Sequence, residues 1–246
     1  MTHTRSVLER IAEGDDPGYE RGSFVGEPIT VRLPIAIHAN RSGAIVVNYP
    51  GANGDIDGYY DKYVKIADSL QRQNVGAVVR TANREHYGLL YADAVQADLR
   101  HVIRYALRNA EDICGSETPH MYLMGFSAGA GAIAAVAHEF GHVEKILLMA
   151  PSGDAGRDAV YNGLAQFSGE VYIAIGENDE VVGKDAGQLF YDLAVNARSR
   201  QLVVIPDCDH QFRGEINGRI MSKAPFWAFT GDTTFPSPEG GIKLYD

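Results

Sequence analysis

A short stretch near the middle of the chain joins an apolar run to a helix of small residues through a Gly-x-Ser-x-Gly pentapeptide. Residues 121–124 are apolar, as in a buried strand, and residues 130–137 are rich in alanine, which suits a helix packed close to a sheet. Gly125 and Gly129 flank Ser127, and because they have no side chains a sharp strand-to-helix turn can close there. The stretch predicts an exposed serine hydroxyl at a helix N-terminus; a plain glycine-rich turn with a capping serine is the alternative.

Apolar runs and helical patterns alternate along the rest of the chain. Short apolar runs predict buried strands, and apolar residues three or four positions apart predict helices. The expected strands are residues 44–47, 75–79, 121–124, 145–149, 171–175 and 201–205. The expected helices are residues 59–73, 91–108, 127–140, 159–167, 186–197 and 214–222, the last stopped by Pro225. This alternation indicates an α/β fold with a mostly parallel central sheet and helices on both faces.

The two ends of the chain have weaker patterns. Residues 1–21 predict a loosely packed N-terminal arm, with one amphipathic turn around Leu8 before a cluster of glycine, aspartate and proline. In part of residues 22–38, apolar residues alternate with polar ones, which predicts an antiparallel edge hairpin or pair of strands. No repeat, linker or change of composition divides residues 22–230. We therefore expect one domain there and an irregular tail at residues 231–246.

The composition excludes several classes of protein. Of the 246 residues, 45% are hydrophobic, enough for a buried sheet, and the net charge of −10 would repel a nucleic-acid backbone. Two cysteines, Cys114 and Cys208, are too few for a disulfide framework. A polar N-terminus argues against a signal peptide, and no apolar run reaches the roughly 18 residues of a membrane span. We expect a cytoplasmic monomer or homodimer.

Polar residues follow the later strands, at the strand ends where sites form in parallel sheets. A serine nucleophile needs a base, which is usually histidine, and a carboxylate to fix the histidine tautomer. His210 follows the last expected strand and is the only histidine after His142, and Asp179 follows the strand before it. The order Ser127, Asp179, His210 predicts nucleophile, acid and base.

Other carboxylates compete with Asp179 for the place beside the histidine. Glu177 and Glu180 share its loop, and Asp154 follows the preceding strand. Asp207 and Asp209 are close to His210 in sequence, but we expect such near neighbours to point away from it.

The pentapeptide, the acid loop at residues 176–179 and the base loop at residues 209–210 together resemble the α/β-hydrolase family. The resemblance covers roughly residues 29–229. It implies that Ser127 is the nucleophile, Asp179 the acid and His210 the base. It also implies that two backbone amides stabilise the oxyanion.

The resemblance assigns one of these amides to Ala128 and the other to the loop at residues 49–54. Many members of the family have His-Gly in that loop, whereas this chain has Pro50 and Gly51. The departure leaves the second donor open, with Ala52 favoured over Asn53.

Only residues 151–170 separate two neighbouring strands, too few for a lid domain. The chain is therefore similar to small lidless members such as dienelactone-hydrolase-like esterases. Their type enzymes carry a cysteine nucleophile, and the serine here favours ordinary ester hydrolysis. The resemblance implies an acyl-enzyme, a small or partly exposed ester substrate and no cofactor. A thioesterase, a peptidase, an acyltransferase and a non-catalytic binding protein are the alternatives.

Further residues are assigned to the expected substrate pocket. Arg80 and Arg84 belong to a loop expected after a strand, where an arginine would bind a substrate carboxylate; solvated surface charges are the alternative. The other assigned residues are Gly51, Asn53, Tyr59 and Phe126.

One motif points to a different chemistry. His138, Glu139 and His142 spell H-E-x-x-H, a pattern that binds zinc when it lies on one continuous helix. Gly141 favours a helix end inside the motif, and the residues that follow offer no clear third ligand. We therefore expect a polar helix end and no metal, with a zinc peptidase as the least favoured alternative.

Overall fold

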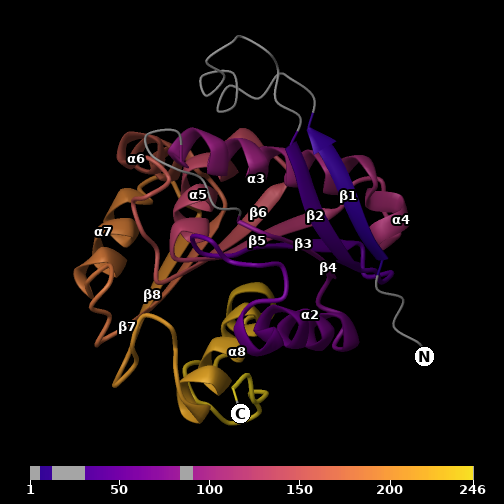
Figure 1. The fold of residues 1–246 in the computed structure, drawn as a ribbon. Coiled ribbons are helices and arrows are strands. Elements are labelled where there is room, and N and C mark those ends of the chain that lie inside the picture. The colour runs from indigo at the N-terminus through magenta and orange to yellow at the C-terminus, as the bar shows by residue number, and fades with distance from the viewer. Residues whose placement is uncertain (1–5, 13–30, 84–90, 246) are drawn as a thin grey trace.

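The structure, a computed structural model, describes residues 6–12, 31–83 and 91–245. Its centre is a sheet in the order β1-β2-β4-β3-β5-β6-β7-β8, drawn in Figure 1. The β1-β2 and β2-β4 pairs are antiparallel and the other five pairs are parallel. The strands are β1 (Ser6–Ala12), β2 (Val31–His38), β3 (Ala44–Tyr49), β4 (Ala77–Thr81), β5 (His120–Phe126), β6 (Val143–Met149), β7 (Glu170–Gly176) and β8 (Ser199–Ile205).

Helices cover both faces of the sheet because its central strands are apolar on both sides. In β3, Ile45 and Val47 join one core and Val46 the other, since successive side chains of a strand point to opposite faces. The first core contains residues of α3 (Tyr91–Arg108), α4 (Ala110–Cys114), α5 (Ala128–Val136), α6 (Arg157–Gln166) and α7 (Asp185–Leu193). The second contains residues of α2 (Lys62–Arg72) and α8 (Glu215–Thr230), which lie below the sheet in Figure 1.

The N-terminal segment differs from the expected amphipathic turn. Ser6–Ala12 forms β1, which pairs with residues 31–37 of β2 and makes β1, not β2, the outer strand on this side. The pairing depends on a partner strand some 25 positions away, which local periodicity does not reveal. Residues 13–30, which include most of the expected 22–38 hairpin, lie outside the described residues.

Two element boundaries were also predicted wrongly. β4 runs to Thr81, which moves Arg80 from the expected loop into the strand. α8 passes through Pro225 and continues to Thr230. Proline removes one backbone donor inside a helix, but the last turns are held by packing: Trp227 stacks on Phe235 and contacts Tyr172 edge to face.

Candidate active site

Ser127 occupies a strained turn between β5 and α5. Its φ of 53° and ψ of −122° are unusual for a residue with a side chain. Its amide donates to the Met149 carbonyl of β6 at 2.9 Å, and its carbonyl accepts from Gly131 at 3.1 Å. The turn is therefore fixed by the neighbouring strand and by the first turn of α5, and it raises the serine above the carboxyl end of the sheet, as a nucleophile elbow does.

The glycines around Ser127 are required by close backbone contacts. A Cβ on Gly125 would lie 2.7 Å from the Ala130 nitrogen, and a Cβ on Gly129 would lie 2.2 Å from the Pro50 carbonyl oxygen. The second contact also places the loop after β3 directly against α5.

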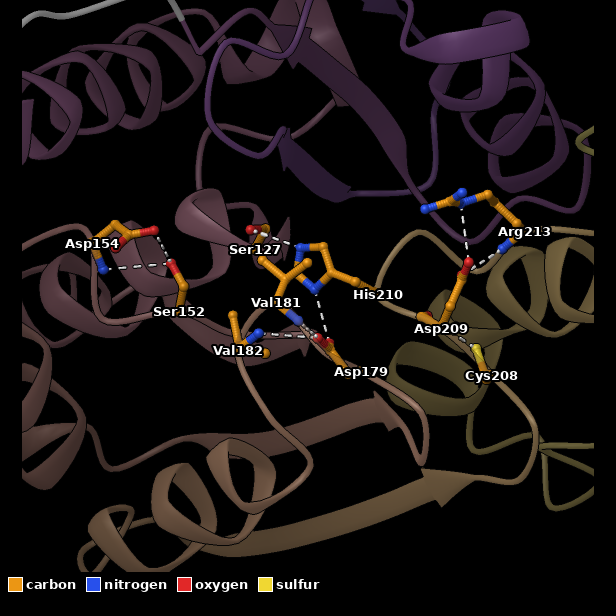
Figure 2. Close-up of polar contacts among 10 residues, drawn as sticks. All are labelled: Ser127, Ser152, Asp154, Asp179, Val181, Val182, Cys208, Asp209, His210 and Arg213. Carbon is orange, nitrogen blue, oxygen red and sulfur yellow. Dashed lines mark hydrogen bonds and ion pairs between the residues drawn. The ribbon is translucent and has the colours of Figure 1, made fainter.

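His210 lies between Ser127 and Asp179, as Figure 2 shows. Its Nε2 is 3.1 Å from Ser127 Oγ, and its Nδ1 is 2.8 Å from Asp179 Oδ2. A neutral imidazole satisfies both contacts when Nδ1–H donates to the carboxylate and Nε2 accepts from the hydroxyl. The arrangement gives the hydroxyl a base and gives the base a carboxylate that fixes its tautomer.

The carboxylate of Asp179 is held by its own loop. Asp179 is 4% exposed, and its Oδ1 accepts hydrogen bonds from the Val181 and Val182 amides, each at 3.0 Å. These donors stabilise the charged carboxylate while Oδ2 faces His210. The loop thus presets the position of the acid.

The competing carboxylates make other contacts. Asp154 binds the Ser152 hydroxyl at 3.0 Å, and Asp209 forms an ion pair with Arg213 at 3.0 Å, to either side of His210 in Figure 2. The side chains of Glu177, Glu180 and Asp207 are exposed, whereas the carboxylate paired with the histidine is buried. Among the described residues, Asp179 is the carboxylate that the structure brings to His210.

The loop after β3 faces the serine. A Cβ on Gly51 would lie 3.2 Å from Ser127 Cβ. Asn83, which was not predicted, holds this loop: its side chain donates to the Pro50 carbonyl at 3.2 Å and its amide to the Gly54 carbonyl at 2.9 Å. Its position just after a strand was the one sequence signal for it.

The two predicted oxyanion donors belong to the two segments that meet at Ser127, which are α5 and the loop after β3. Ala128 is the first residue of α5, so its amide has no acceptor within that helix. Ala52 and Asn53 are exposed in the facing loop, with Asn53 at a φ of 56°. The choice of Ala52 as second donor stays a prediction.

Arg80 does not lie where a substrate would meet it. The side chain is fully buried, and its Nε donates to His38 Nε2 at 2.9 Å. Its Nη1 donates to the Ile56 carbonyl and to Asp57 Oδ1 at 2.8 Å. These bonds tie the loop after β3 to β2 and β4, which is a structural contact. Arg84 lies outside the described residues.

Two of the residues assigned to the pocket, Phe126 and Tyr59, are aromatic and differ in exposure. Phe126 is 5% exposed, and its ring centre is 5.1 Å from that of His210. The Nζ of Lys62, a residue that sequence analysis missed, lies over the same ring, 4.7 Å from its centre. Burial lowers the Lys62 pKa to about 8, against a smaller opposite effect of Asp55. Tyr59 is 71% exposed near this lysine.

The H-E-x-x-H residues do not share a helix. His138 and Glu139 end a 3-10 turn (Ala137–Glu139), and Phe140 is extended, so His142 lies beyond the helix end. Hydrogen bonds from Arg100 at 2.7 and 2.8 Å hold the Glu139 pKa below its usual value. Within the described ranges, no cluster of three potential metal ligands occurs.

The two cysteines are free and buried. Burial, together with Asp209 and Asp179, raises the Cys208 pKa to about 12. A thiol with that pKa is protonated near neutral pH and is a poor nucleophile, so the cysteine two positions before His210 does not compete with Ser127.

The sheet order, the two helical layers and the serine turn after β5 define the α/β-hydrolase fold. α6 is the one helix in the connection from β6 to β7, and no lid is present among the described residues. None of the described helices is both long enough and apolar enough to cross a membrane.

Comparison with solved structures supports this fold. The chain resembles the esterase Pf2001 of Pyrococcus furiosus, with a TM-score of 0.66, 14% identity, and 93% and 94% of the two chains covered. It also resembles Est1E of Butyrivibrio proteoclasticus, with a TM-score of 0.62, 16% identity, and 87% and 95% covered. Its similarity to dienelactone hydrolase of Anabaena variabilis has a TM-score of 0.61 and 16% identity, and covers 91% of this chain and 99% of that chain. No family model and no curated protein matches the sequence.

Proposed function

We propose that this chain is a serine hydrolase that cleaves carboxylic esters through an acyl-enzyme, with Ser127 as nucleophile, His210 as base and Asp179 as the orienting carboxylate. The observation that carries the proposal is the hydrogen-bonded chain from Ser127 Oγ through His210 to Asp179. Its position at the carboxyl end of the sheet supports it. The esterase names of the structural neighbours agree with it.

In the first step, Ser127 Oγ forms a bond to the ester carbonyl carbon while its proton passes to His210 Nε2. The Asp179 carboxylate stabilises the resulting imidazolium through Nδ1–H. The carbonyl oxygen gains negative charge, and the amides of Ala128 and Ala52 are the proposed donors to it. Such a donor is worth about 3 kcal/mol in the transition state.

In the second step, the bond between the carbonyl carbon and the alcohol oxygen breaks. The Nε2 proton moves to the leaving alcohol, and the acyl group stays on Ser127. Water then repeats the sequence, giving its proton to Nε2 and releasing the carboxylic acid and the free serine hydroxyl. No cofactor enters either half of the reaction.

The connection from β6 to β7 contains α6 and no lid domain that would cover Ser127. This favours small or partly exposed esters as substrates. The same residues would act on thioesters and peptides, or pass the acyl group to an alcohol. Matched ester, thioester and anilide substrates, with and without added alcohol, separate these activities by kcat/KM.

A fluorophosphonate probe tests the proposal directly, since it reacts with activated serines. We expect labelling at Ser127 in the wild type and its loss in Ser127→Ala. Ser152→Ala is the matched control, because Ser152 is a neighbouring buried serine whose hydroxyl binds Asp154. A folded wild type that is neither labelled nor able to cleave 4-nitrophenyl esters from acetate to decanoate would contradict the proposal and favour a binding protein.

A further inference from the structure

A groove opens between the start of α2, the loop after His210 and the C-terminal tail. Its volume is about 480 Å³, and its walls include Tyr59, Tyr60, Lys62, Gln211, Arg213 and Tyr245. The Phe126 ring is close to one residue of the groove and one of the candidate site, with its centre 4.7 Å from Lys62 Nζ and 5.1 Å from the His210 ring centre. The groove is therefore near His210, with Phe126 in contact with a residue of each.

Lys62 is an unusual residue for the wall of such a groove. Its side chain is only 5% exposed, yet its ammonium makes no hydrogen bond or ion pair with any residue that the structure describes. Its close contacts are the rings of Tyr63, at 5.1 Å, and Phe126. The carboxylate of Asp55 accepts instead from the Asp57 and Gly58 amides. A buried charge is costly unless it is paired, so an anion entering the groove would satisfy it.

The rest of the groove suits an anion carried on an apolar body. Arg213, exposed and ion-paired with Asp209, adds a second cation at the rim. Asp209 offsets the charge of Arg213, so Lys62 is the cation that would attract an anion to the groove. Tyr245 donates its hydroxyl proton to the Gln211 carbonyl at 2.9 Å, and its ring contacts Tyr60 edge to face. These fixed aromatic walls would cover a short chain or a ring.

We propose that this groove is the subsite for a carboxylate carried by the ester substrate, with the Lys62 ammonium as the group that binds it. The inference rests on the proposed function, since it names the substrate class of the same site. Lys62 donates hydrogen bonds to the carboxylate oxygens, and the tyrosines pack against the chain or ring that carries it. Lys62 is then a specificity residue, whose loss raises KM more than it lowers kcat.

Two pairs of substrates test the inference, one for each side of the ester bond. Mono-4-nitrophenyl adipate against 4-nitrophenyl hexanoate places the charge on the acyl side. 4-Butyryloxybenzoate against its methyl ester places it on the alcohol side. The quantity measured is the ratio of kcat/KM for the charged member to that for the neutral member, in the wild type, Lys62→Met, Lys62→Arg and Lys65→Met.

We expect the charged member to be preferred in at least one pair, and Lys62→Met to lower that ratio about tenfold, as the loss of a buried charge-assisted hydrogen bond does. Lys62→Arg should keep part of the preference. Lys65→Met is the control, because Lys65 lies on the same helix but donates to the Leu244 carbonyl. Equal ratios in the wild type and Lys62→Met for both pairs would overturn the inference.

Binding without turnover separates this inference from the proposed function. Calorimetry with adipate and with 4-hydroxybenzoate should give a dissociation constant about tenfold higher in Lys62→Met than in the wild type for the preferred ligand. If Ser127 is not labelled but carboxylates bind through Lys62, the hydrolase proposal fails and the subsite stands. If Ser127 is labelled and neither carboxylate distinguishes the two proteins, the subsite fails and the hydrolase stands.

Discussion

The Cα of Gly129 lies so close to the Pro50 carbonyl that a Cβ on it would come within 2.2 Å of the carbonyl oxygen. This contact brings the first turn of α5 against the loop after β3, the two segments that flank Ser127. We predict that Gly129→Ala lowers the free energy of unfolding by about 2–4 kcal/mol, since backbone must shift on one side or the other.

Urea unfolding of Gly129→Ala and of Gly141→Ala tests this prediction. Gly141 also lies near the end of the α5 segment, but a Cβ there meets nothing within 4 Å. Its substitution should change stability by less than about 0.5 kcal/mol. Equal stabilities of the two variants would show that the loop and the helix are not packed as described.

Asp179→Asn should lower kcat about 10³- to 10⁴-fold with little loss of stability. The amide preserves the shape of the side chain but favours the wrong histidine tautomer and cannot stabilise the imidazolium. Asp154→Asn is the matched control, because Asp154 follows the preceding strand and binds Ser152 instead. A larger loss of kcat in Asp154→Asn than in Asp179→Asn would indicate that Asp154, and not Asp179, is the carboxylate that orients His210.

Arg80→Met should lower the free energy of unfolding by about 3–5 kcal/mol, because it leaves the buried His38 and the half-buried Asp57 without their donor. Arg198→Met, which removes an exposed pair with Glu170, should cost less than about 1 kcal/mol. The preference for charged over neutral esters should not change in Arg80→Met. Loss of that preference in a well-folded Arg80→Met protein would indicate that Arg80 binds the substrate carboxylate.

Lys62→Met should raise the free energy of unfolding at pH 7 by about 1–3 kcal/mol, because it removes a desolvated charge. The Lys62 pKa of about 8 lies below its ordinary value of 10.5, so below pH 8 the folded state carries the full cost of the charge. The cost is relieved as pH rises from 8 to 10.5. The stability difference between the two proteins, measured by thermal unfolding from pH 6 to 10, should therefore shrink in that window. A destabilised Lys62→Met at pH 7 would indicate a structural lysine.

The same pKa gives a kinetic prediction. The preference in kcat/KM for the charged ester of a pair should fall as pH rises through about 8, because kcat/KM reports the free enzyme and Lys62 loses its charge there. The preference in Lys62→Met should not vary over this range. If the wild-type preference for the charged ester is constant from pH 6 to 10, the Lys62 ammonium does not bind the substrate carboxylate.

The sequence was sufficient for the fold and for the three residues that the structure brings together. Strong apolar runs located the parallel strands, and parallel strands end at one edge, so the loops holding Ser127, Asp179 and His210 had to converge. α3 has the bounds that its periodicity predicts, Tyr91–Arg108. These features depend on local pattern and on a topology that local pattern implies.

The features that the sequence did not reveal depend on distant packing. Nothing in the pattern of α2 distinguishes Lys62 from Lys65, and only the fold places one of them over Phe126. Arg80 was misplaced because a two-residue error in a strand end moves a side chain from a loop into the core. The pairing of β1 with β2 and the passage of α8 through Pro225 likewise depend on partners far away in the chain.

The most direct test of the account is the detection of the covalent intermediate. The wild type would be mixed with 4-nitrophenyl butyrate, quenched in acid within milliseconds, digested and analysed by mass spectrometry, with Ser127→Ala and Ser152→Ala beside it. The account predicts a butyryl group on the peptide that contains Ser127, formed as 4-nitrophenol is released in a burst, in the wild type and Ser152→Ala only. Turnover with no acyl group on Ser127, or with equal turnover in Ser127→Ala, would contradict it.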